Sequence, residues 1–270
     1  MTKVVAAIDD TPAAARVLTT AGAVAQLFDA TLEAVHVRQD GQETAARAAH
    51  AAGLPLATVG GGVVEALVAA ARRPDVSALV LGTRDVASET APLGSTALAV
   101  ISSVPTPVVL VPPRGTPLER IRHVLLPLEG TAQTSLAPVA VLRLARDAAV
   151  DVLALHVLDE SSLPRFTDQP QHETEAWTRE FVARYCPHGL HSLSLALRVG
   201  RPEEAILRVA EETGVDLIAL GWNQRLAPGR AAIVRAVLER GRLPLLLIPA
   251  LGAEPDREVV GDPVGSSATG

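Results

Sequence analysis

The sequence is poor in residues on which several protein classes depend. Its 270 residues include a single cysteine, Cys186, which excludes an intrachain disulfide. Aromatic residues make up 2% of the chain, so the core must be built from alanine, valine and leucine. Few side chains are therefore available for stacking on bases or sugars. No apolar run approaches the roughly 18 residues that a membrane-spanning helix needs.

Clustered positive charge is also missing. The formal net charge is −6, and Lys3 is the only lysine. No group of lysine and arginine residues stands out as a footprint for a phosphate backbone, so nucleic acid is not an expected partner. The first residues pass directly into a strand pattern, without a charged and then apolar leader. These absences predict a cytoplasmic protein that binds neither nucleic acid nor membrane.

What the sequence does contain is an ordered internal repeat. The four matches pair residues 4–11 with 124–131, 34–37 with 154–157, 75–82 with 215–221 and 107–112 with 244–249. The first two pairs share an offset of 120 residues, a period far too long for a solenoid repeat. The repeat therefore predicts a duplicated globular domain, in which each functional question can be asked twice.

Short apolar runs alternate with helical patterns in the first copy. The predicted strands are residues 4–8, 32–37, 56–59, 79–81 and 107–111. Helices are predicted after Thr11-Pro12 and over residues 42–52, 63–73 and 96–103. Alternating strands and helices indicate a parallel sheet with helices on both faces. The predicted fold class is α/β, with two tandem doubly wound domains that each contain a five-stranded parallel sheet.

A stretch rich in proline divides the two copies. We predict a first domain over residues 1–112, a linker over 113–120, a second domain over 121–250 and a disordered tail over 251–270. In the second copy, residues 161–187 carry Trp177, Phe181 and Tyr185 and are expected to add a loop and a full helix.

The last strand of each copy is apolar and would promote aggregation if its edge were bare. We therefore expect residues 108–111 and 245–248 to pair across a pseudo-twofold axis, which makes the chain an internal pseudo-dimer. A homodimer of the whole chain is left open.

Residues able to bind a ligand gather where the strands of the first copy end. In a doubly wound sheet, the ligand site lies beyond the carboxyl ends of the strands. The residues expected at this edge are Asp9, Asp10, His36, Val37 and Gly82. Gly94-Ser95-Thr96 opens the last helix with free backbone N–H groups and two hydroxyls, a combination that suits phosphate. From these residues alone, ordinary turn and capping roles for Asp9 and Ser95 are favoured.

Taken in order, these features resemble the universal stress protein family, and both halves match over nearly the whole chain short of the tail. The resemblance is to two-domain members and implies a Rossmann-like, adenine nucleotide alpha hydrolase-like fold. It implies a non-enzymatic stress-response or regulatory module whose first domain binds ATP or another adenine nucleotide. By matching positions, the implied cofactor-binding residues are Ala7, Ile8, Asp9, Val37, Gly82, Gly94, Ser95 and Thr96.

The sequence departs from the family's nucleotide loop. ATP-binding members carry Gly-x2-Gly-x9-Gly-Ser/Thr after the fourth strand. Here Asp85 stands at the second glycine, and the spacing to Gly94-Ser95 is one residue short. A carboxylate beside a triphosphate costs affinity. In the second copy, Glu129 replaces Asp9 and Ala231-Ala232 replaces Gly94-Ser95, so at most the first half is expected to bind nucleotide.

Two alternatives to a nucleotide-binding module remain. A ligand-free protein-interaction module with both pockets decayed is favoured by Asp85 and by the second copy. An adenylating or hydrolysing enzyme is not expected, because no nucleophile, base and orienting residue occur together. No metal site is expected either: Cys186, His188 and His191 lack a fourth ligand and a recognised spacing, while His36 and His156 are expected to hydrogen-bond locally.

Overall fold

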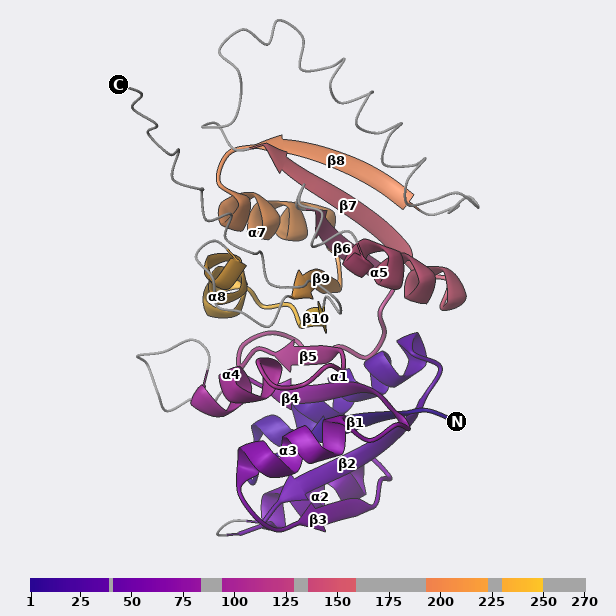
Figure 1. Cartoon of the computed structure of the whole chain (residues 1–270), viewed down its shortest axis with the longest axis vertical. Helices are drawn as coiled ribbons and strands as arrows, with labels where there is room; N and C mark the ends of the chain where they lie inside the picture. The colour runs from indigo at the N-terminus through magenta and orange to yellow at the C-terminus, as the bar shows by residue number, and fades with distance from the viewer. Residues whose placement is uncertain (39–40, 84–93, 129–135, 159–192, 223–229, 250–270) are drawn as a thin grey trace, which may run out of the picture.

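The computed structural model describes residues 1–38, 41–83, 94–128, 136–158, 193–222 and 230–249 (Figure 1). In these residues, ten strands form one sheet in the order β3-β2-β1-β4-β5-β10-β9-β6-β7-β8. Strand pairing within each half is parallel, which confirms the predicted α/β fold. None of the helices described is long and apolar enough to cross a membrane.

The first half contains five strands and four helices, each within a few residues of its predicted place. They are β1 (Lys3–Ala7), α1 (Ala13–Leu27), β2 (Thr31–Val37), α2 (Glu43–Ala51), β3 (Leu56–Val59), α3 (Val63–Ala71), β4 (Val76–Gly82), α4 (Ser95–Ile101) and β5 (Val108–Val111). Pro12 occupies the N-cap position of α1, directly after Thr11.

The described elements of the second half follow the same order, with residues 159–192 between β7 and β8 outside the described ranges. Its elements are β6 (His123–Leu128), α5 (Leu136–Asp147), β7 (Asp151–Leu158), β8 (Leu193–Val199), α7 (Pro202–Thr213), β9 (Leu217–Trp222), α8 (Arg230–Arg240) and β10 (Leu245–Pro249). The additional helix predicted within residues 161–187 and the tail predicted over 251–270 lie outside the described residues.

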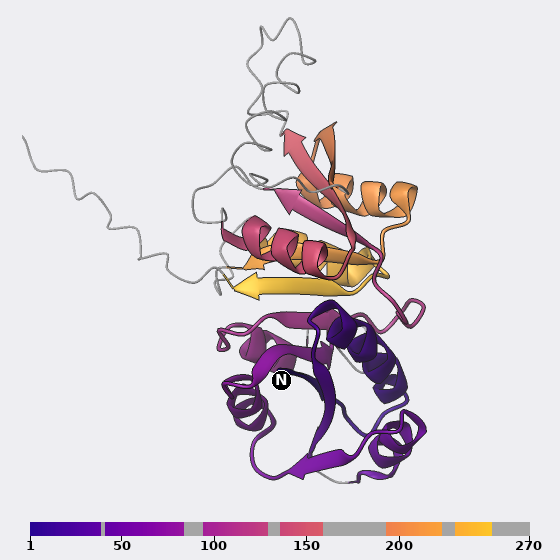
Figure 2. The same ribbon diagram turned by 90° about the vertical axis from the view of Figure 1, so that its right-hand side faces the viewer.

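Helices cover both faces of the sheet (Figure 2). Helices α1, α2 and α5 pack on one face and share a single apolar core. Helices α3, α4, α7 and α8 pack on the other. The predicted apolar stripe of α1 is buried at Val17, Ala21 and Val24, because residues three and four apart lie on one side of a helix. Each core layer therefore runs through both halves of the molecule.

The two halves join through their last strands. Strand β5 pairs antiparallel with β10, with Leu110 opposite Leu245, Val109 opposite Leu246 and Val108 opposite Leu247. All six side chains are buried. This pairing confirms the prediction that each apolar edge covers the other.

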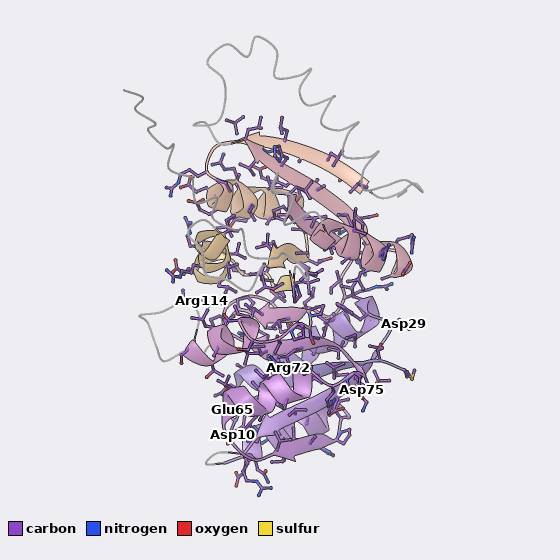
Figure 3. The ribbon with its side chains drawn as sticks, in the orientation of Figure 1. Asp10, Asp29, Glu65, Arg72, Asp75 and Arg114 are labelled. Carbon is purple, nitrogen blue, oxygen red and sulfur yellow. The ribbon has the colours of Figure 1, made fainter. Side chains whose placement is uncertain are left out.

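Four charged side chains tie together the amino ends of β1, β2 and β4, at the edge of the sheet opposite the last residues of the strands. Figure 3 labels Asp75 at this edge and Asp10 at the other. The Arg73 Nη1 and Nη2 atoms each donate to a Glu33 carboxylate oxygen at 2.9 Å. Lys3 Nζ lies 3.2 Å from both Glu33 Oε2 and Asp75 Oδ2. The hydrogen bonds from Arg73 lower the pKa of Glu33 below its usual 4.5.

Replacing Glu33 with glutamine is expected to lower the free energy of unfolding at pH 7 by about 0.5–1 kcal/mol, the range for a partly exposed ion pair. A carboxylate with a lowered folded-state pKa stabilises the fold above its unfolded pKa, and this stabilisation is lost as pH falls through the folded value. Urea unfolding measured from pH 7 downward should therefore show a difference that shrinks as the pH falls. A loss that stays the same as the pH falls would contradict this account. Asp147→Asn, which removes the carboxylate of an exposed pair with Arg146, is the control.

Candidate functional site

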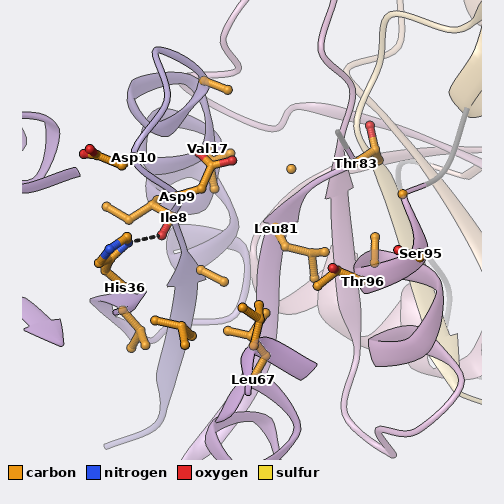
Figure 4. A pocket seen from close by; sticks show the side chains of 18 of the residues that line it. Ile8, Asp9, Asp10, Val17, His36, Leu67, Leu81, Thr83, Ser95 and Thr96 are labelled. Carbon is orange, nitrogen blue, oxygen red and sulfur yellow. Dashed lines mark hydrogen bonds between the residues drawn. The ribbon is translucent and has the colours of Figure 1, made fainter. Parts of the chain in front are cut away.

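A cavity of about 410 Å³ opens at the carboxyl ends of β1 and β4 (Figure 4). Strand β1 lies between β2 and β4, so the chain order reverses there, as at the ligand sites of doubly wound sheets. The volume falls within the roughly 300–1,000 Å³ of small-molecule sites. All eight residues singled out from the sequence line this cavity: Ala7, Ile8, Asp9, Val37, Gly82, Gly94, Ser95 and Thr96. Their role in binding stays a prediction.

The inner part of the cavity is apolar. Val35 from β2, Leu67 from α3 and Leu81 from β4 line it, and all three are buried. Sequence reasoning missed these residues as site residues, because their pattern is that of ordinary core positions. Nothing in an apolar run indicates which of its side chains will border a hollow.

Polar groups lie where α4 begins. The Gly94 N–H donates to the Thr83 carbonyl oxygen at 3.0 Å, and a Cβ added to Gly94 would lie 3.1 Å from that oxygen. Glycine thus allows the start of α4 to approach the end of β4 closely. No hydrogen bond joins the Ser95 or Thr96 hydroxyl to another residue of the described part, so both are available to a ligand.

The two aspartates after β1 differ in their surroundings. Asp10 Oδ1 accepts hydrogen bonds from the backbone N–H groups of Thr44 at 2.6 Å and Ala45 at 3.0 Å, so Asp10 caps α2. Asp9 is exposed, and its Oδ1 accepts a hydrogen bond from the Thr11 hydroxyl at 2.6 Å. Asp9 is therefore the carboxylate of this pair that is accessible to a ligand.

A buried histidine forms part of the same wall. The His36 side chain contacts the carbonyl oxygens of Ile8 and Gly41, which confirms the expected local hydrogen bonding. In the second half, His156 occupies the equivalent strand end. Burial lowers the pKa of His156, while its hydrogen bond to the Leu128 backbone acts in the opposite direction.

The charged groups that line the described part of the cavity are acidic. They are Asp9 and Asp10, and no lysine or arginine joins them. No cluster of three or more histidine, cysteine, aspartate or glutamate side chains placed to hold a metal ion occurs among the described residues. Asp85 and the group Cys186, His188 and His191 lie outside those residues.

The residues that would decide whether the second half has a site are not described. Glu129 and residues 223–229 lie outside the described ranges, as do the side chains of Trp222, Ala231 and Ala232. The absence of a nucleotide pocket from this half therefore stays a prediction.

One protein family matches this sequence, and solved structures of similar fold are known. The Universal stress protein family matches the chain over residues 38–112 and 120–249. A universal stress protein from Archaeoglobus fulgidus DSM 4304 has a similar structure, with a TM-score of 0.65, 16% identity and coverage of 92% of this chain and 98% of that one. A functionally unknown protein from Pseudomonas aeruginosa PAO1 gives a TM-score of 0.64, 12% identity and 92% coverage of both chains. At these identities, the likeness establishes the fold alone. No curated protein matches the sequence.

Proposed function

The chain belongs to the universal stress protein family, and we propose that its first half binds an adenine nucleotide, with ATP the first choice, in the cavity between β1 and β4. One observation carries the proposal: eight residues selected from four separate stretches of sequence line a single cavity at the switch point of the sheet. A cavity of this size at this place is where the fold binds small molecules.

The lining suggests how such a ligand would lie. The apolar inner wall of Val35, Leu67 and Leu81 suits the flat face of an adenine ring, since burial of apolar surface drives association. The exposed Asp9 carboxylate would accept hydrogen bonds from ribose hydroxyls. The hydroxyls of Ser95 and Thr96 would donate to phosphate oxygens.

We further propose that the site serves binding and regulation rather than turnover. Hydrolysis or adenylation would need a base held against a nucleophile or a water molecule. Both ring nitrogens of His36, the histidine of the described lining, already face backbone carbonyl oxygens. A binding role is also what the resemblance to universal stress proteins implies.

Calorimetric titration of the full chain with ATP is the direct test. We expect saturable heat with one ATP bound per chain, because the second half has Glu129 in place of Asp9 and Ala231-Ala232 in place of Gly94-Ser95. GTP and inorganic phosphate are the comparison ligands, and release of ADP is followed in the same samples. Sustained ADP release by pure protein would contradict the non-enzymatic part of the proposal.

The competing function is a ligand-free interaction module. The acidic lining of the described cavity favours it, because a triphosphate would meet Asp9 and Asp10 without a neighbouring lysine or arginine side chain there. The absence of heat at millimolar ATP would support this alternative over nucleotide binding.

A further inference from the structure

The His36 ring bridges two backbone segments that border the cavity. The side chain sits near the end of β2, with 3% of the residue's surface exposed. Its Nδ1 atom lies 2.9 Å from the Ile8 carbonyl oxygen, and its Nε2 atom lies 3.2 Å from the Gly41 carbonyl oxygen. Ile8 and Gly41 both line the cavity, one after β1 and the other beyond β2 (Figure 4). The ring thus joins two walls of the same site.

These two contacts compete for one proton when the imidazole is neutral. A carbonyl oxygen can only accept a hydrogen bond, and a neutral imidazole carries a hydrogen on one ring nitrogen. In either neutral tautomer, the other nitrogen directs its lone pair at a carbonyl oxygen. The imidazolium ion has an N–H on both nitrogens, so it alone can donate to Ile8 and Gly41 together.

Acidic groups share the cavity with the ring. Asp10 packs against Gly41, where its Oδ2 atom is 2.8 Å from the position that a Cβ would occupy. Asp9 also lines the cavity. Strand β3 has no ionisable side chain, and Asp40 lies outside the described residues. The other titratable groups on the segments around the ring are mostly exposed: Arg38 after β2, Glu43, Arg47 and His50 of α2, and Glu65 of α3. Glu33 of β2 is paired with Arg73, and Arg16 of α1 donates to the Pro112 and Pro113 carbonyl oxygens.

We propose that His36 is a positioning residue that holds both walls of the cavity only when its ring is protonated, so that the site binds its ligand more tightly in mild acid. The effect on ligand affinity rests on the proposed nucleotide binding, whereas the bridging of the two walls by His36 does not. A wall that is already fixed loses less freedom when the ligand arrives, and affinity rises accordingly. One additional hydrogen bond corresponds to a gain of about three- to tenfold.

The duplicated half supplies an internal control. His156 follows His36 by 120 residues in the sequence. It lies near the carboxyl end of β7, and His36 lies near the carboxyl end of β2. Burial lowers the pKa of His156, and its side chain is not part of the cavity lining. His156→Gln therefore removes an equivalent histidine without touching the cavity.

Nuclear magnetic resonance of the full chain tests the positioning role without any ligand. With ¹⁵N-labelled histidine, a pH titration reports whether one or both ring nitrogens of His36 carry a proton. The Gly41 amide and the Ile8 carbonyl carbon should shift with the same midpoint. A ring that keeps a single proton throughout, or a Gly41 signal that does not follow it, would overturn the proposal. This measurement uses the wild-type chain, so it does not depend on a variant that folds.

ATP titration at pH 8 and pH 6 then tests the consequence for binding. The gain in affinity on acidification should be about three- to tenfold larger in the wild type and in His156→Gln than in His36→Gln. The phosphate groups of ATP titrate in the same way with all three proteins, so their contribution cancels when the proteins are compared. An equal pH effect in all three would overturn the positioning role. If ATP does not bind at either pH, nucleotide binding fails, and the nuclear magnetic resonance result still decides whether His36 holds the walls.

Discussion

Replacing Gly94 with valine and Ser95 with alanine is expected to abolish ATP binding, with a loss of at least about 100-fold in affinity. The Gly94 N–H donates to the Thr83 carbonyl oxygen at 3.0 Å, and a Cβ at Gly94 would stand 3.1 Å from the same atom. The branched side chain of valine must therefore push the start of α4 away from the end of β4. Removal of the Ser95 hydroxyl also deletes a donor to phosphate, and hydrogen bonds to charged groups contribute about 1.5–3 kcal/mol each.

Calorimetric titration measures this loss, with Ser102→Ala as the matched control. Ser102 lies at the other end of α4 and does not line the cavity, so its variant should bind ATP as the wild type does. Thermal unfolding of the double variant should show that the fold persists, because the change is confined to the start of one short helix. Unchanged affinity in the double variant would mean that phosphate binds elsewhere.

Much of the fold could be predicted because its signals are local. Each buried parallel strand is a short apolar run, and the helix after Thr11 shows its apolar stripe at spacings of three and four residues. The pairing of β5 with β10 followed from the cost of two bare apolar edges. Strand β4 was predicted too short, because Ser77 interrupts the apolar pattern. In the structure, the Ser77 hydroxyl donates to the Lys3 carbonyl oxygen, which allows this polar residue within the strand.

The candidate site was only partly predictable, because several of its features depend on contacts between distant residues. Asp10 caps a helix that begins more than thirty residues later, so no local capping pattern marks it. The Thr83 carbonyl oxygen restricts position 94 to a small residue only because the fold brings Gly94 close to it. His36 could be placed at a strand end from the sequence, but its two carbonyl partners come from two other segments.

Replacing Leu246 with aspartate is expected to give the largest loss of stability, at least about 4 kcal/mol in the free energy of unfolding. Leu246 is 1% exposed and stands opposite Val109 in the β5–β10 pair. A carboxylate there would be buried among apolar side chains of both halves, without a partner for its charge. Urea unfolding measures the loss, and Val199→Asp on β8 is the matched control. Val199 is 53% exposed, so its variant should cost little.

The same measurement tests whether the two halves unfold as one unit. Val109 and Leu246 belong to one apolar core, which contains residues of α1 and α5 from opposite halves. We therefore expect the wild type to unfold in a single transition, because opening the junction exposes the apolar edge of β5 and that of β10 at once. Two separate transitions in the wild type, or a Leu246→Asp variant that destabilises only one half, would show instead that each half is stable alone. In that case each half would have to remain soluble with the apolar edge of its last strand exposed. The pairing of β5 with β10 avoids that exposure.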